Sequence, residues 1–272
     1  MLCSVWSEFF RCSEMTLAEK AAAFAECGFA ASELSDEDGA RLLAEHSSAA
    51  DAGKAVRRIT EETGFRFPQG HLWLAARITG DDYLQKFEQL RPWLDMYLEA
   101  GIPRAVLHAN SARGQSYAVA HERRMVVLSR IAEYLRGTGL TICVENIFGT
   151  DHAESAALLG LMRELSSPNF GICLDTGHLN LHGETQADFI RSCGSHLKAL
   201  HIADNQGASD QHMMPFGRGT IDFFSVVREL RAVGYDGVFN YEIPGENSCP
   251  VEVKKMKLRY LRQATDYLLG NA

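Results

Sequence analysis

The chain has 272 residues, of which 46% are hydrophobic, and it carries a formal net charge of −8. This length suits one large domain or two small ones, and the apolar fraction is sufficient for a full core. The acidic balance argues against a general electrostatic attraction to nucleic acid, although it does not exclude a local basic patch.

The seven cysteines are scattered and show no Cys-x-x-Cys spacing. An odd number of scattered cysteines is typical of free thiols in a reducing compartment. The N-terminus has no basic segment followed by an apolar run, and no apolar run approaches the length of a membrane span. We therefore expect a soluble cytoplasmic protein without a membrane partner.

Short apolar segments with strand character recur along the chain, and all but the first lead to a histidine or a carboxylate. The first segment covers residues 2–6. The residues that end the other segments are, in chain order, Glu33, His71, His108, Glu145, Asp175, His201 and Glu242. Successive members of this series are 26 to 41 residues apart, which is the length of one strand, one helix and two loops.

Helical patterns fill the intervals between these strands. They cover residues 16–28, 36–64 with a break near 47–48, 81–100, 116–136, 153–165, 184–193, 222–233 and 251–269. The first pattern opens with a capping box at Thr16 and Glu19. The charged residues 121–124 indicate a solvated helix face rather than a basic binding patch. A long polar loop over residues 201–222 follows the seventh strand, and long loops in compact domains are usually functional.

Strands and helices that alternate at this spacing predict a parallel sheet of βα units. Eight units in one domain, residues 1–272, predict a closed (β/α)8 barrel, or TIM barrel, which typically needs about 250 residues. In such a barrel the carboxyl ends of all strands open onto one face, which carries the active site. We therefore expect six of the strand-end side chains to converge there, together with three from loops. The six are His71, His108, Glu145, Asp175, His201 and Glu242, and the three are His178, Asp210 and His212.

This expected cluster combines carboxylates with imidazoles. Packed carboxylates raise one another's pKa, and a divalent cation removes that conflict. Mixed nitrogen and oxygen ligands suit Zn, Mn, Fe or Co. None of the predicted strands ends on a cysteine, which argues against a metal site with thiolate ligands. For any single histidine a hydrogen-bonded structural role is the simpler interpretation. The repetition at successive strand ends is what favours a metal site.

Five segments carry a more specific signal. They are Val-Glu-Asn at 144–146, Leu-Asp-Thr-Gly-His at 174–178, His-Ile-Ala-Asp-Asn at 201–205, Gly-Arg-Gly-Thr-Ile-Asp at 217–222 and Tyr-Glu at 241–242. With these segments the chain resembles, over nearly its whole length, the xylose isomerase-like TIM barrels. That superfamily includes endonuclease IV, hydroxypyruvate isomerase, inosose dehydratase and the ketose 3-epimerases.

The resemblance to the sugar isomerases and epimerases implies one divalent ion, such as Mn, Zn or Co, held by Glu145, Asp175, His201 and Glu242. The two glutamates would also act as acid and base on opposite faces of the substrate. His178 matches a substrate-binding histidine. The implied activity is proton transfer next to a carbonyl through an enediolate, on a small sugar, sugar phosphate or polyol.

The endonuclease IV branch implies a second hypothesis, a trinuclear zinc phosphodiesterase that acts on abasic DNA. Its additional ligands would be His71, His108, His178, Asp210 and His212. The acidic balance and the lack of obvious DNA-wedging insertions argue against this alternative without deciding it. A third hypothesis is a sugar-binding barrel without catalysis, which ranks lowest because binding alone does not require two opposed glutamates.

The substrate contacts are the least specific part of this interpretation. Ketose epimerases carry an arginine shortly after the histidine that matches His201, whereas residues 204–209 contain none. Arg218 could replace it, or the substrate could differ. His71 and His108 are further candidates, and Trp73 could be either a substrate-covering aromatic or an ordinary packed residue. The identity of the sugar and the oligomeric state, a homo-oligomer included, stay open.

Overall fold

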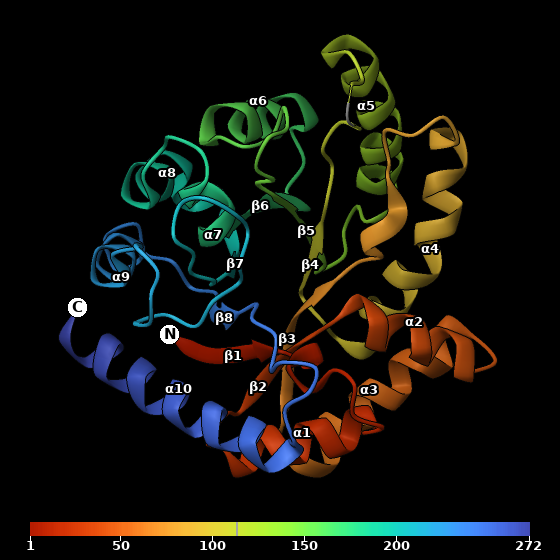
Figure 1. Cartoon of the computed structure of the whole chain (residues 1–272). Helices are drawn as coiled ribbons and strands as arrows, with labels where there is room; N and C mark the ends of the chain where they lie inside the picture. The colour runs from red at the N-terminus through yellow and green to blue at the C-terminus, as the bar shows by residue number, and fades with distance from the viewer. Residues whose placement is uncertain (113) are drawn as a thin grey trace.

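Eight parallel strands form the centre of the molecule (Figure 1). The computed structural model describes residues 1–112 and 114–272. The strands are β1 (Leu2–Trp6), β2 (Ala31–Leu34), β3 (Arg66–His71), β4 (Arg104–Leu107), β5 (Thr141–Glu145), β6 (Phe170–Asp175), β7 (Leu197–His201) and β8 (Val238–Tyr241). They pair in the order β7-β6-β5-β4-β3-β2-β1-β8. A parallel bridge between Ile202 and Tyr241 joins β7 to β8. The prediction of a single (β/α)8 barrel is therefore confirmed.

Helices surround this sheet and connect its strands (Figure 1). They are α1 (Leu17–Glu26), α2 (Asp36–Glu45), α3 (Ala49–Thr63), α4 (Tyr83–Ala100), α5 (Tyr117–Tyr134), α6 (Ser155–Leu165), α7 (Thr176–Asn180), α8 (Gln186–Cys193), α9 (Phe223–Ala232) and α10 (Val251–Asn271). Three short 3-10 helices follow β1, β3 and α8: η1 (Ser7–Phe10), η2 (Leu74–Ala76) and η3 (Gly194–His196). In the part of the chain that the structure describes, no helix combines the length and apolar character needed to cross a bilayer.

Local side-chain caps explain where several helices begin. The hydroxyl of Thr16 accepts the backbone N–H of Glu19, whose carboxylate accepts the N–H of Thr16 at 2.8 Å, so the predicted capping box is confirmed. The predicted break in the second helical region is also confirmed, because Ser48 caps a separate helix, α3. Such caps satisfy the free N–H groups of the first helical turn.

The prediction of a solvated face at residues 121–124 is wrong for Arg124. This side chain on α5 is fully buried. Its guanidinium donates to the carbonyl oxygen of Ala109 and, at 2.7 Å, to Asp151. Arg124 thereby connects the loop after β4 to the loop after β5. Its burial is tolerated because the carboxylate and the carbonyl oxygen replace the water that a buried cation loses.

A small group of residues fills the barrel interior beneath the carboxyl ends of the strands. Val106, Cys143, Cys173 and Ala199 form this separate buried cluster. They lie on β4, β5, β6 and β7, one or two residues before the strand ends. The sheet thus has an apolar floor directly below the side chains at its carboxyl edge. All seven cysteines are free thiols and five are buried, as we expected.

Candidate metal centre and active site

Four ligand-type side chains meet at the carboxyl ends of four consecutive strands. Glu145 ends β5, Asp175 ends β6, His201 ends β7, and Glu242 directly follows β8. Asp175 and His201 are register partners in the sheet. One nitrogen or oxygen atom of each of the four lies within 4.8 Å of the others. The barrel topology therefore brings together the four residues that the resemblance implied as metal ligands.

Several nitrogen and oxygen atoms of these four side chains lack hydrogen-bond partners within the described part of the chain, as expected of atoms that bind a cation. Glu145 Oε1, Asp175 Oδ2 and His201 Nδ1 are buried and have no hydrogen-bond partner among the described residues. Buried polar atoms in folded proteins are rarely left unpaired. Three of the unpaired atoms belong to one cluster of oxygen and imidazole donors, which is the ligand set that Zn, Mn and related divalent ions bind.

Glu33 orients His201, and the sequence interpretation gave Glu33 no role in the site. Its buried carboxylate lies 3.1 Å from His201 Nε2 and accepts an N–H of Asn240 at 2.7 Å. The opposite ring nitrogen, Nδ1, then points to Glu145 and Glu242, each 3.3 Å away. A carboxylate behind a histidine is a recurrent feature of metal sites because it fixes the tautomer and the ring orientation.

Asn146 fixes the position of Asp175 through two hydrogen bonds to its backbone. Its side-chain amide donates to the carbonyl oxygen of Asp175 at 3.0 Å and accepts the N–H of Asp175 at 2.7 Å. One carboxylate oxygen of Asp175 accepts the N–H of His178 at 2.6 Å, where α7 begins. The other oxygen, Oδ2, is the buried atom without a hydrogen-bond partner among the described residues.

Histidines from four elements complete this face of the barrel. His108 Nε2 lies 3.0 Å from Glu145 Oε2, and His71 Nε2 lies 3.7 Å from the same oxygen. Asp210 lies 3.3 Å from His178 Nε2 and 3.2 Å from His212 Nε2. Three further groups of described residues have a geometry that could hold an ion: His71 with His108 and Glu145, Asp175 with His178 and His212, and Glu145 with Cys173 and His201.

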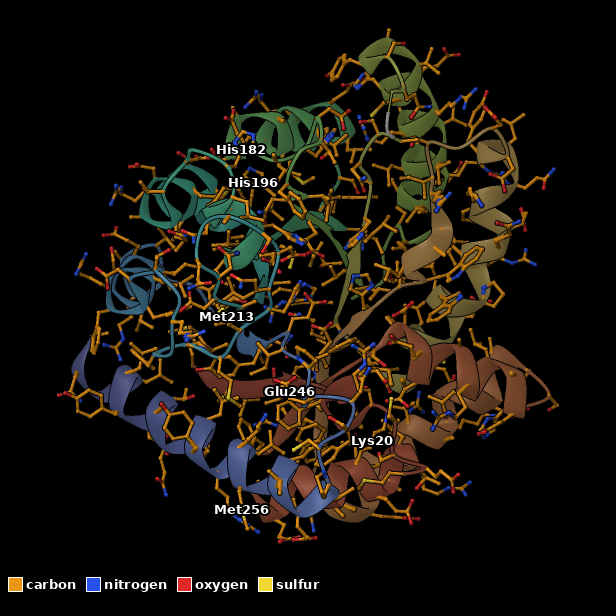
Figure 2. All side chains as sticks on the ribbon, viewed as in Figure 1. Lys20, His182, His196, Met213, Glu246 and Met256 are labelled. Carbon is orange, nitrogen blue, oxygen red and sulfur yellow. The ribbon has the colours of Figure 1, made fainter. Side chains whose placement is uncertain are left out.

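Asp210 and His212 belong to the long loop between β7 and α9. Figure 2 labels Met213 in this loop, which lies beside β7 and β8. His212 Nδ1 is 2.8 Å from the carbonyl oxygen of Glu242, so the loop is attached to the end of β8. The expectation that this polar loop approaches the strand ends is confirmed by these contacts.

The electrostatics of the cluster favour a positive partner. Burial raises the pKa of Glu242 to about 7, with a further contribution from the neighbouring carboxylate of Glu145. Burial also acts on Glu145, but the charges of His201 and His108 hold the pKa of that carboxyl well below its usual range. Despite burial, the nearby carboxylates raise the pKa of His178 to about 12. Against the effect of burial, the carboxylates likewise raise the pKa of His71, His201 and His212, whereas burial lowers the pKa of His108. The carboxylates thus draw protons onto most of the imidazoles, a demand for positive charge that a cation would meet.

A cavity of about 450 Å³ opens over this cluster. Its volume lies within the range of small-molecule sites, about 300–1,000 Å³. It is lined by Trp6, Arg11, Asp36, Glu37, His71, Leu74, His108, Glu145, His178, Asp210, Gln211, His212, Glu242 and Pro244. Most of the predicted histidines and both glutamates therefore share one cavity with residues from the end of β1 and from the segments that follow β1 and β2.

Comparison with known proteins identifies the family. Residues 21–266 match the model of the xylose isomerase-like TIM barrels. The chain belongs to this family. Among solved structures, a D-tagatose 3-epimerase-like protein superimposes with a TM-score of 0.80 at 21% identity, covering 99% of this chain and 98% of that one. At this identity the likeness shows the fold alone.

Curated relatives of this xylose isomerase-like barrel match only part of it. An uncharacterized protein from Methanocaldococcus jannaschii is 34% identical over 121 residues, which cover 42% of this chain and 41% of the relative. A ketose 3-epimerase from Arthrobacter globiformis is 28% identical over 118 residues, covering 42% and 39%. A probable endonuclease 4 from Ureaplasma parvum is 28% identical over 144 residues, covering 47% of each. The chain thus spans about half the length of these relatives or less.

Two predicted substrate contacts lie elsewhere in this xylose isomerase-like barrel. Trp73 packs against the core, and the Lys86 ammonium lies 5.2 Å from the centre of its ring. Arg218 is exposed on the loop after β7. Neither residue lines the cavity, whereas Leu74 does. Contact of Trp73 or Arg218 with a substrate stays a prediction.

Two aromatic residues near the cavity were not identified from the sequence. Trp6 lines it from the end of β1. The ring of Phe148, in the loop after β5, lies 5.4 Å from the ring of His178 and is partly exposed. The position of Trp6 at a strand end was the one signal that could have identified it. Phe148 had none, because its place depends on the loop conformation.

Proposed function

We propose that this chain is a divalent-metal-dependent isomerase or epimerase that moves a proton next to a carbonyl group of a small sugar or polyol. The observation that carries this proposal is the convergence of Glu145, Asp175, His201 and Glu242 with unpaired buried atoms turned toward one another. Similarity to a ketose 3-epimerase supports the same class of reaction.

In this proposal the same four residues hold the ion. When bound, the ion would polarise the carbonyl and the neighbouring hydroxyl of the substrate, which makes the C–H bond between them more acidic. Glu145 and Glu242 project from β5 and from the end of β8, so they approach the substrate from different strands. One carboxylate removes the proton from carbon and the other group returns it.

The histidines around the four ligands would position the substrate. His71, His108 and His178 line the cavity next to Glu145. Imidazole N–H groups at hydrogen-bond distance can hold hydroxyl oxygens and fix which carbon faces the carboxylates. Asp210 and His212 would hold His178 from the loop side, because Asp210 lies between the two rings.

Solvent deuterium incorporation tests this function directly. The metal-loaded protein is incubated in D₂O with a panel of ketoses, aldoses and inososes, and exchange at the carbon next to the carbonyl is followed by NMR. We expect exchange with at least one sugar, together with formation of its epimer or isomer. Absence of exchange across the panel, with the ion bound, would contradict the proposal.

The second candidate function is hydrolysis of a phosphodiester in abasic DNA by three zinc ions. The observation that favours it is the presence of further potential ion sites, among them one at His71 and His108 and one at His178 and His212. Similarity to a probable endonuclease 4 points the same way. Cleavage of an abasic oligonucleotide by the zinc-loaded protein would establish this alternative in place of proton transfer.

A further inference from the structure

The side of the cavity opposite Glu145 and Asp175 has its own chemistry. Trp6, Arg11, Asp36 and Glu37 line it, and we call these four residues the far wall. They follow β1 and β2, whereas Glu145 and Asp175 end β5 and β6. In a closed barrel of eight strands in this order, these two pairs of strands face each other across the axis (Figure 1). A ligand that reaches from the ion toward β1 and β2 would meet the far wall.

Arg11 is available to bind such a ligand. Its guanidinium lies over the ring of Trp6, 5.7 Å from the ring centre. Arg11 takes part in none of the ion pairs formed by the described residues, whereas nearby Lys20 is paired with both Glu8 and Asp38. Arg11 is also the one arginine that lines the cavity among residues 1–112 and 114–272. A guanidinium offers five N–H donors and no acceptor, so it suits the oxygens of a bound molecule.

The two carboxyl groups of the far wall provide the complementary acceptors. One oxygen of Asp36 accepts the backbone N–H of Leu74 at 3.1 Å, which fixes this side chain at the edge of the cavity. Glu37 is adjacent and exposed on α2, and partial desolvation of its carboxyl together with the charge of Asp36 raises its pKa to about 7. Hydroxyl groups both donate and accept hydrogen bonds, so a surface that combines a guanidinium with carboxyl groups matches them.

The same residues disfavour a phosphate. The N-terminus of a helix is normally a good site for a phosphate, because its free N–H groups and its dipole attract anions. Here Asp36, Glu37 and Asp38 occupy the first turn of α2, where that site would be. A phosphate monoester carries a charge of about −1.5 to −2 at neutral pH, so the carboxylate of Asp36, with the partly ionised Glu37 beside it, would repel it. Asp38 contributes little to this repulsion because Lys20 is already paired with it.

We propose that the far wall is a subsite for the hydroxylated end of an unphosphorylated sugar, with Arg11 donating to its oxygens and Asp36 and Glu37 accepting from its hydroxyls. This inference rests on the proposed function and narrows its substrate class to sugars without a terminal phosphate. It also assigns to Arg11 the contact for which the sequence suggested Arg218.

Kinetics with a matched pair of substrates test this subsite. The pair is a free sugar that exchanges deuterium and the same sugar phosphorylated at its far end. For the wild type we expect kcat/KM to be at least about tenfold higher for the free sugar. The double variant Asp36→Asn/Glu37→Gln should narrow this difference by raising kcat/KM for the phosphorylated sugar, because it removes repulsion. A wild-type preference for the phosphorylated sugar would overturn the proposal.

Single arginine variants separate Arg11 from the alternatives. Arg11→Met should raise KM for the free sugar about tenfold with little change in kcat, as expected when a contact is equally strong before and during the reaction. Arg58, which is exposed on α3 and does not line the cavity, provides the matched control, and Arg58→Met should leave KM unchanged. A rise in KM for Arg218→Met but not for Arg11→Met would contradict the assignment.

The experiments distinguish a failure of the far-wall proposal from a failure of the proposed function. If no sugar exchanges deuterium, the proposed function fails, and calorimetry then measures the binding of each free ketose of the panel and of the same ketose phosphorylated at its far end. The far-wall proposal would still require tighter binding of the free sugar to wild type than to Arg11→Met. Equal binding by the two proteins would overturn it.

Discussion

Two clusters of buried charged side chains lie at the carboxyl end of the barrel, and they differ in how their polar atoms are satisfied. In one, Lys20 on α1 (Figure 2) donates to Glu8 at 2.6 Å and to Asp38 at 2.8 Å, and Ser7 donates to Asp38 at 2.6 Å. In the other, the candidate metal centre, buried atoms of Glu145 and His201 have no hydrogen-bond partner among the described residues.

This difference separates a structural cluster from a ligand site. The ammonium of Lys20 has carboxylate partners, and neither it nor the carboxylates appear among the buried unpaired atoms of the described chain. It therefore ties α1 to α2 and to the segment after β1 without needing anything else. The candidate metal centre instead keeps buried ligand-type atoms of Glu145, Asp175 and His201 without a hydrogen-bond partner among the described residues. Burial of charge alone does not indicate function; unpaired buried atoms that converge do.

The largest expected effect is on turnover at the candidate metal centre. Glu145→Gln removes both a ligand charge and a proton-transfer group, so it should lower the rate of deuterium exchange by at least about 100-fold. Thermal unfolding followed by circular dichroism should show that the barrel persists. Glu122, exposed on α5, provides the control, and Glu122→Gln should retain the wild-type rate. Full activity of Glu145→Gln would contradict the claim that unpaired buried atoms mark the candidate metal centre as the catalytic cluster.

Substitution in the structural cluster around Lys20 should lower the stability of the fold rather than the rate of turnover. Lys20→Met leaves two buried carboxylates without their cation, so we expect the free energy of unfolding to fall by about 3–5 kcal/mol. Urea unfolding measures this change. The metal content of the protein that remains folded should equal that of the wild type. Unchanged stability combined with loss of the ion would show that Lys20 serves the site rather than the fold.

A smaller effect, on metal affinity, is expected for Glu33, which supports a ligand but is not itself predicted to bind the ion. Glu33→Gln weakens the charge-assisted contact behind His201 but leaves the ligand in place. Loss of such a supporting partner typically lowers metal affinity about 10–100-fold. Competition with a fluorescent chelator measures the affinity, with Glu122→Gln again as the control. An unchanged affinity would mean that Glu33 only stabilises the sheet interior.

The positions of the metal ligands could be predicted from sequence because they depend on periodicity. Each strand of a parallel barrel ends on the same face, so His108, Glu145, Asp175 and His201 were placed once the strand–helix repeat was recognised. The five-residue helix α7 was not predicted. It is too short for a 3.6-residue pattern, and it begins where Asp175 accepts the N–H of His178.

The supporting and lining residues could not be predicted in this way. Glu33 also ends a predicted strand, but its contact with His201 spans 168 residues of sequence and depends on which strands face each other. Arg124 has the sequence context of a solvated helix residue, and its burial follows from the conformation of two loops. Arg11 reaches the cavity from the turn directly after the 3-10 helix η1, and neither segment has a periodic signal. These features depend on loop geometry and register rather than on local pattern.

The metal content of each chain tests the central claim most directly. Protein purified without chelators or a metal-affinity tag is analysed by mass spectrometry, alongside Asp175→Asn. We predict about one divalent ion per wild-type chain and a loss of most of it in the variant. About three zinc ions per chain would show that His71, His108, Asp210 and His212 are ligands as well, and would contradict the single-ion account in favour of phosphodiester hydrolysis.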